Sequence, residues 1–263
     1  MRMRRYVMGM IAGLVGAVAL SSIASAEVTS LSIGAHWTPA KQDKKRYGPA
    51  KVFIETNEAH AGAFLGQPGC MTGNELSCFA TPPSVQSLIT FPKDVAIDPG
   101  NLPACSLASL TGKSTAAARA DCPRSIVGEG SSVGRSLDGR TLNGVITAFK
   151  GVPSGGNPSL YLLLDIAGVA TKPILNGVVR GHTLTLQIPP VQGMVSEHFD
   201  TTLNPVLTRK KRNKKTGKAE KTFLISIRCS KSRRWTTTET ITYQTGKTLT
   251  DSVSQKCKQK RRR

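Results

Sequence analysis

Apolar and polar residues alternate with a period of two in many short runs of this chain, and long patterns with the helical period of 3.6 are missing. The cleanest run is 182–188, in which Leu184, Leu186 and Ile188 share one face. Such alternation is typical of a β-strand with one buried face. Comparable runs lie at residues 30–37, 51–56, 85–91, 95–97, 142–149, 160–166, 174–179, 222–229, 235–243 and 248–253. The chain is therefore expected to consist mainly of short strands.

These strands predict an all-β fold, an antiparallel β-sandwich of the immunoglobulin-like or jelly-roll-like kind with disulfide-pinned loops and a C-terminal hairpin region. Residues 160–164 are apolar at every position, which predicts a central strand covered on both faces. The alternating threonines of residues 236–242 predict a solvated sheet face, because threonine suits strands but adds little to a core. The Ala-rich residues 114–120 are the one good helix candidate. The glycines of residues 128–130 and 155–156 are expected in turns.

The first 26 residues have the three parts of a signal peptide. Three arginines precede an apolar run at 7–20, and Ala24-Ser25-Ala26 supplies a cleavage site before Glu27. An uncleaved membrane anchor is the alternative, although the run is shorter than the roughly 20 residues that a spanning helix needs. We therefore expect a secreted protein, whose charge suits association with the cell wall or cell surface. The expected organisation is a signal peptide (1–26), a β-sandwich domain (27–204), a C-terminal β-hairpin region packed on it (205–257) and a disordered basic tail (258–263).

All six cysteines follow the leader, and an even number in an exported chain indicates disulfides. They fall into three neighbouring pairs, which predicts the bonds Cys70–Cys78, Cys105–Cys122 and Cys229–Cys257. Zinc would compete for the same residues, but neither CxxC spacing nor a histidine close in sequence accompanies them. Metal-ligand spacing is also missing among the four histidines, which are His36, His60, His182 and His198. No metal and no cofactor is therefore predicted.

The charge of the chain is strongly unbalanced, with 36 Lys and Arg against 16 Asp and Glu and a net charge of +20. Such an excess indicates a polyanionic partner, for example teichoic acid, acidic polysaccharide, anionic lipid, polyphosphate or nucleic acid. In the densest run, 209–221, Asn213 and Gly217 predict the turn of a projecting hairpin. Its candidate binding residues are Arg209, Lys210, Lys211, Arg212, Lys214, Lys215 and Lys218. A second basic cluster lies at 256–263, and the alternatives are a solvated loop and a tail that bind nothing.

Signatures of catalysis are weak, since no GxSxG motif stands at a turn from a predicted strand directly into a predicted helix, as a nucleophile elbow requires. A carboxylate pair for glycoside hydrolysis would form if two of Asp165, Glu197, Asp200 and Glu239 met in space, which keeps a polysaccharide-acting enzyme as the alternative function. Nucleic acid is a less favoured partner, because few aromatic residues accompany the basic runs as stacking platforms. The favoured function is a non-enzymatic exported module that binds an acidic surface or polymer, such as the cell wall or a glycan.

Several short motifs recur in a familiar order. They are Phe91-Pro92, Leu102-Pro103-Ala104-Cys105, CPxSxVGxG at residues 122–130, Ala148-Phe149-Lys150-Gly151, and the series Cys229, Trp235, Tyr243, Gly246 and Cys257. In these motifs the chain resembles a family of exported proteins of high-GC Gram-positive bacteria. The resemblance implies export and a β-rich fold, and it implies no activity. The basic insert at 209–221 is where this chain departs from the family pattern.

Overall fold

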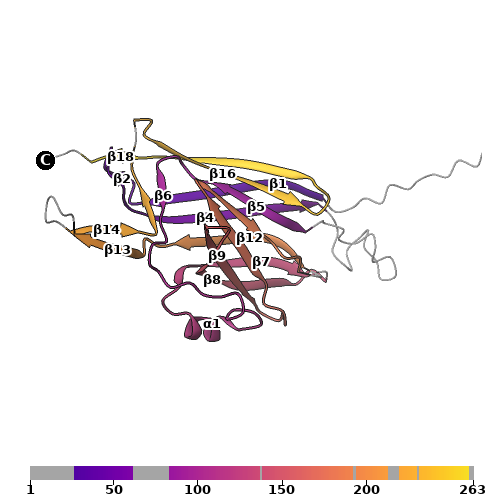
Figure 1. Cartoon of the computed structure of the whole chain (residues 1–263). Coiled ribbons are helices and arrows are strands. Elements are labelled where there is room, and N and C mark those ends of the chain that lie inside the picture. The colour runs from indigo at the N-terminus through magenta and orange to yellow at the C-terminus, as the bar shows by residue number, and fades with distance from the viewer. Residues whose placement is uncertain are drawn as a thin grey trace, which may run out of the picture.

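The computed structural model describes residues 27–61, 83–136, 138–191, 194–212, 219–229 and 231–260 (Figure 1). Within them the chain forms eighteen β-strands and one short helix, and eleven of the strands make a single antiparallel sheet. The spatial order of the sheet is β1 (Glu27–Thr38), β4 (Lys51–Ala61), β12 (Met194–Leu203), β7 (Ile126–Ser136), β8 (Thr141–Ser154), β9 (Asn157–Ile166), β10 (Ile174–Arg180), β11 (Thr183–Gln187), β5 (Ser84–Thr90), β16 (Arg234–Tyr243) and β17 (Thr248–Lys256). The all-β antiparallel fold expected from the period-two runs is confirmed.

The main sheet folds over on itself, so that its two edge strands, β1 and β17, lie against each other without a backbone ladder. Side chains of β17 bond to the backbone of β1 instead. Asp251 Oδ2 accepts a hydrogen bond from the Ile33 N–H at 2.9 Å. Gln255 accepts from the Trp37 N–H at 2.7 Å and donates to the Trp37 carbonyl at 3.0 Å. These bonds occupy backbone groups that an open sheet edge would offer to another chain.

The two halves of the folded sheet face each other across an apolar interior. Trp37 of β1 is buried and packs edge-on against Phe91, with the ring centroids 5.9 Å apart. Its indole Nε1 donates to Thr237 Oγ1 of β16 at 3.3 Å, which ties the two halves together. Leu184 and Leu186 of β11 are buried, as their alternation predicts.

The outer face of β16 and β17 carries the polar row that the alternating threonines predict. Thr236, Thr238 and Thr240 each exchange a hydrogen bond with a Ser or Thr hydroxyl of β17, with oxygen–oxygen distances of 2.8, 2.8 and 2.9 Å. These pairs lie on the surface, where threonine stabilises a strand without entering the core.

Strand β9 is covered on both faces, as its continuous apolar sequence predicts. Its residues 159–164 are all buried. The even-numbered leucines face the interior, whereas Tyr161 and Leu163 pack outside the sheet against the segment 105–122. A strand buried on both faces needs apolar side chains at every position, which explains the run.

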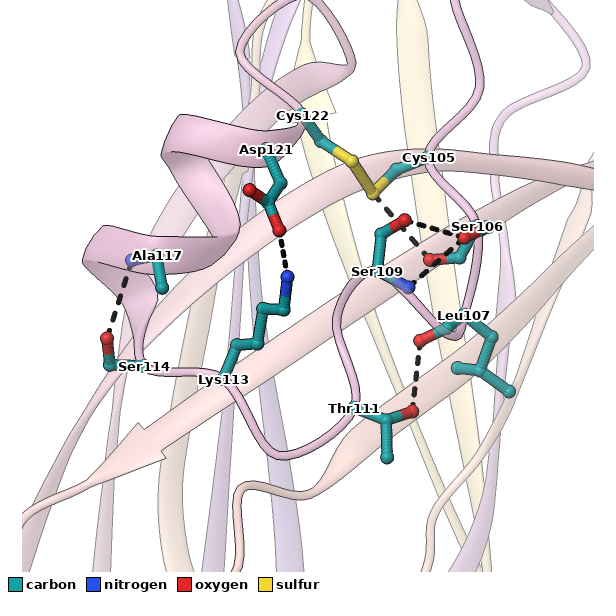
Figure 2. A network of polar contacts seen from close by, with 10 residues as sticks. All are labelled: Cys105, Ser106, Leu107, Ser109, Thr111, Lys113, Ser114, Ala117, Asp121 and Cys122. Atoms are coloured by element: carbon teal, nitrogen blue, oxygen red, sulfur yellow. Dashed lines mark hydrogen bonds and ion pairs between the residues drawn. A yellow bond between two sulfur atoms is a disulfide. The ribbon is translucent and has the colours of Figure 1, made fainter.

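The segment that covers β9 is closed by the Cys105–Cys122 disulfide and ends in α1 (Thr115–Asp121), as Figure 2 shows. Ser114 caps the helix, because its Oγ accepts a hydrogen bond from the Ala117 N–H at 3.4 Å. The predicted helix and the predicted disulfide are both confirmed. No helix in the described part of the chain is long and apolar enough to cross a membrane.

The prediction of a turn at residues 128–130 is wrong, because these residues lie inside strand β7. Its neighbour β12 approaches so closely that a Cβ on Gly128 would lie 2.2 Å from the Thr202 carbonyl oxygen, and one on Gly130 would lie 2.0 Å from that of Asp200. Glycine is required here by close backbone approach rather than by a turn. The turn expected at 155–156 is confirmed by positive φ angles of 55° and 76°.

Three small sheets lie outside the main one. They are the antiparallel hairpin β13 (Leu207–Arg212) and β14 (Ala219–Phe223), the sheet of β3 (Gly48–Pro49), β15 (Ile225–Ile227) and β6 (Val95–Ile97), and the parallel pair β18 (Lys258–Gln259) and β2 (Lys41–Gln42). In Figure 1 the hairpin extends away from the main sheet at the left, the end where β2 and β18 also lie.

The C-terminal part of the chain is more closely integrated than its sequence predicts. The prediction of a disordered tail from residue 258 is wrong for Lys258 and Gln259, because they pair with Lys41 and Gln42. Residues 261–263 lie outside the described residues. Strands β16 and β17, in the region expected to pack on the sandwich, continue the main sheet beside β5.

Candidate functional sites: a basic end and an acid-lined cavity

The predicted Cys229–Cys257 disulfide is present, and it gathers distant parts of the chain at one end of the molecule. Cys229 N–H donates to the Asp43 carbonyl at 2.9 Å, and Cys257 N–H donates to the Arg233 carbonyl at 3.0 Å. Beside this bridge β18 pairs with β2. The segments brought together in this way are 41–46, 231–234 and 256–260.

These three segments carry ten cationic residues that are exposed, and we call them the basic end. They are Lys41, Lys44, Lys45, Arg46, Lys231, Arg233, Arg234, Lys256, Lys258 and Lys260. The one acidic residue in the segments is Asp43. Its Oδ1 accepts hydrogen bonds from the backbone N–H groups of Lys45 and Arg46 at 2.7 and 2.9 Å, which shapes the turn that presents these cations. A dense, solvent-facing group of like charges raises the local concentration of anions.

The predicted basic hairpin contributes further charge at the same side of the molecule. Strands β13 and β14 pair with Lys210 opposite Lys221. Of the seven candidate residues, Arg209 is exposed and the backbone of Lys210, Lys211 and Arg212 continues β13, whereas Lys214, Lys215 and Lys218 lie outside the described residues. The predicted Cys70–Cys78 bond also lies outside them.

Among the described residues, a single exposed aromatic side chain lies next to the basic end, directly after the segment 41–46. Tyr47 is 44% exposed, and the Arg228 guanidinium carbon lies 5.0 Å from its ring centroid. The same guanidinium forms an ion pair with Asp94 at 3.1 Å. One tyrosine that is already stacked on arginine does not make a platform for successive nucleic-acid bases.

The second candidate site is a cavity of about 100 Å³ inside the folded sheet. Inward-facing leucines and an isoleucine of β8 to β11 form an aliphatic wall. Strands β4, β5 and β16 contribute five polar side chains to the lining, which are Thr56, Glu58, Ser84, Ser87 and Glu239. A smaller cavity of about 60 Å³ shares Glu58 with the larger one. The interior is thus apolar along most of its surface and acidic in one place.

Glu239 is only 2% exposed, and both of its carboxylate oxygens receive hydrogen bonds from the protein. Ser87 Oγ donates to Oε1 at 2.6 Å, and Thr56 Oγ1 donates to Oε2 at 2.8 Å. Burial raises the pKa of Glu239, and the two hydroxyl donors act against that rise.

Glu58 lies two residues after Thr56 on β4 and lines both cavities. The Tyr243 hydroxyl donates to its Oε2 at 3.0 Å. Its Oε1 has no donor among the described residues. Burial raises the pKa of Glu58 to about 7, with a smaller contribution from the charge of Glu239. Burial also raises the pKa of the Tyr243 phenol, which stays protonated and remains a donor.

His60 follows on the same face of β4 and lines the smaller cavity. Its Nε2 lies 2.5 Å from the Ser196 carbonyl oxygen, which accepts the hydrogen bond when Nε2 carries the proton. The other ring nitrogen, Nδ1, is buried without a hydrogen-bond partner in the described part of the chain. Burial lowers the pKa of the imidazole, so the neutral ring is favoured.

The four carboxylates considered for glycoside hydrolysis do not come together. They are Asp165, Glu197, Asp200 and Glu239. The first three do not line the cavity, and each has a basic partner of its own, namely Lys172 at 2.7 Å, Arg135 at 2.7 Å and His198 at 3.2 Å. The hydrogen bond from Lys172 holds the pKa of Asp165 below its usual value, with a further contribution from the Thr115 N–H. Of the four, Glu239 alone lines the cavity, and it shares this lining with Glu58.

Comparison of the chain with protein-family models, curated proteins and solved structures found no match. The geometry of the two sites therefore carries the functional argument.

Sequence reasoning missed two parts of these sites, although signals for both exist. The basic runs at 44–46 and 231–234 are visible in the sequence, but their approach to residues 256–260 is not. Glu58 stands in the same alternating phase as Val52 and Ile54, so the pattern predicts that its carboxyl faces the interior. The same phase argument applies to Glu239 between Trp235 and Tyr243.

Proposed function

We propose that this protein is an exported, non-enzymatic module that binds an acidic polymer or surface, such as the cell wall or a glycan. The observation that carries the proposal is the convergence of ten exposed cations around the Cys229–Cys257 bridge. The basic hairpin formed by β13 and β14 would supply a second set of contacts.

A polyanion suits this surface better than a small anion does. The cations come from three segments and are spread over the end of the molecule, rather than converging on one pocket. Binding a chain of phosphates, sulfates or carboxylates releases its condensed counterions, and the gain grows with the number of cations engaged. The disulfide and the β2–β18 pairing hold the segments in place, so that less conformational entropy is lost when the polymer binds.

Retention on immobilised wall teichoic acid and on heparin, as salt is raised, tests the proposal. The variant Lys44→Gln/Lys45→Gln/Arg46→Gln removes three charges from the basic end. It should elute at lower salt than the wild type and should show a weaker dependence of affinity on salt, because fewer counterions are displaced.

The matched control is Lys113→Gln/Arg124→Gln/Arg140→Gln, which removes the same number of charges from residues outside the basic end. This control should elute close to the wild type. Equal shifts in the two triple variants would mean that net charge alone governs retention, and the basic end would not be a binding site. Elution of the basic-end variant together with the wild type would also refute the proposal.

A further inference from the structure

The interior cavity is an unusual feature in a chain whose surface is so basic. Its described lining contains two carboxyl groups and no lysine or arginine, although the chain has 36 of these cations. The rest of the lining is mostly apolar, and leucine and isoleucine make up half of its residues. Stability alone favours filling such a space with side chains, because empty volume in a core is destabilising.

We propose that this cavity binds a small apolar molecule that carries one protonated amine, and that the amine is received by Glu58. The aliphatic wall formed by β8 to β11 would cover the apolar part of the ligand. The site is separate from the basic end, and the proposal does not depend on polymer binding.

Glu58 is favoured over Glu239 as the acceptor because of the hydrogen bonds that each already has. Ser87 and Thr56 donate one bond to each oxygen of Glu239. Glu58 receives one bond, from Tyr243 to Oε2, and its Oε1 has no described donor. Glu58 also lies where the two cavities meet. A ligand donor at Oε1 would complete the hydrogen bonds of this carboxyl.

The charge of the cavity selects among ligand headgroups. An ionised carboxylate in an apolar cavity is poorly solvated, and an ammonium group supplies both the counter-charge and the missing N–H donor. A ligand hydroxyl would supply a hydrogen bond but no charge. A ligand carboxylate would meet two protein carboxyls with no cation on the lining. The expected order of affinity is therefore amine, alcohol and carboxylate.

The test uses three probes that share one alkyl chain, n-hexylamine, 1-hexanol and hexanoate, titrated into the full mature protein. NMR of the leucine and isoleucine methyl groups reports both affinity and location. Hexylamine should shift the methyl signals of Leu162 and Leu164, and it should bind more tightly than hexanol and hexanoate. Glu58→Gln keeps the size of the side chain and should weaken hexylamine by about tenfold or more, because the ion pair is lost. Its effect on hexanol should be much smaller.

Two further variants test which carboxyl receives the amine of the ligand. Glu129→Gln removes an exposed carboxyl outside the cavity and should leave hexylamine binding as in the wild type. Glu239→Gln should weaken hexylamine less than Glu58→Gln does. The proposal is overturned if hexanoate binds as tightly as hexylamine, if Glu58→Gln weakens the amine and the alcohol equally, if Glu239→Gln has the larger effect, or if no cavity methyl group responds to any probe.

Discussion

The Tyr243 hydroxyl donates a hydrogen bond to the Glu58 carboxylate across the interior of the folded sheet, with an oxygen–oxygen distance of 3.0 Å between residues 185 positions apart. The bond joins β16 to β4, which belong to opposite halves of the sheet. It brings a carboxyl into a largely apolar space, where burial dominates its protonation. This one contact therefore couples the closure of the fold to the chemistry of the cavity.

Glu58→Gln is expected to gain stability relative to the wild type as pH rises from about 5 to about 8. Burial raises the pKa of Glu58 from 4.5 to about 7, so the folded protein keeps a proton that the unfolded chain has released. Wild-type stability should fall across that window by up to about 3 kcal/mol, and glutamine removes this loss because it does not titrate. Urea unfolding at a series of pH values measures the difference. Glu239 is present in both proteins, and its charge is the smaller contribution to the pKa of Glu58, so parallel stability curves would contradict the prediction.

Replacing both Cys229 and Cys257 by alanine should reduce the free energy of unfolding by about 2–4 kcal/mol. It should also weaken retention on an anionic polymer, because the segments of the basic end would no longer be held together. Cys105→Ala/Cys122→Ala is the control, since it opens a loop that covers β9 and carries none of the basic end. That variant should lose stability and keep its retention at low temperature. Equal loss of retention in both would show that the bridge at the basic end has no special role in binding.

Neutralising Lys210, Lys211, Lys214 and Lys215 to glutamine should lower the salt concentration at which the protein leaves teichoic acid or heparin. Lys210 and Lys211 belong to β13, which forms a sheet of its own with β14, so the thermal unfolding midpoint should change little. Each lost contact should also reduce the salt dependence of binding. Salt-gradient elution and a melting curve measure both effects. Elution identical to that of the wild type would mean that the insert is a solvated loop.

Leu163→Ala should destabilise the protein by about 2–5 kcal/mol, although Leu163 points away from the interior of the sheet. The reason is that the 105–122 segment buries it completely. Val145 of the neighbouring strand β8 is 51% exposed and provides the control. Val145→Ala should change stability by no more than about 0.5 kcal/mol. Chemical denaturation of the two variants gives the comparison, and similar small losses would mean that the segment does not cover β9 in solution.

The sequence alone determined the local features of this protein. Alternation along 182–188 decides which face of the strand is buried, because side chains of a strand point to opposite faces in turn. The continuous apolar run of 160–164 indicates cover on both faces. The capped Ala-rich segment after Ser114 and the two described disulfides were also predicted, since both depend on residues close in the chain. The positive charge at 209–221 is also visible in the sequence, but the sequence does not show what these cations bind.

Only the tertiary structure decided which strands are neighbours, and both candidate sites depend on that. A period-two pattern specifies a face but not a partner, because pairing is set by the packing of the whole sheet. Strand β7 was missed for this reason, since its glycines are explained by the approach of β12 and look like turn residues when read alone. For the same reason, the sequence does not predict that residues 41–46 lie next to residues 256–260 in the basic end. It also does not predict the meeting of Glu58 with Glu239, whose strands face each other only because the sheet folds over until β17 reaches β1.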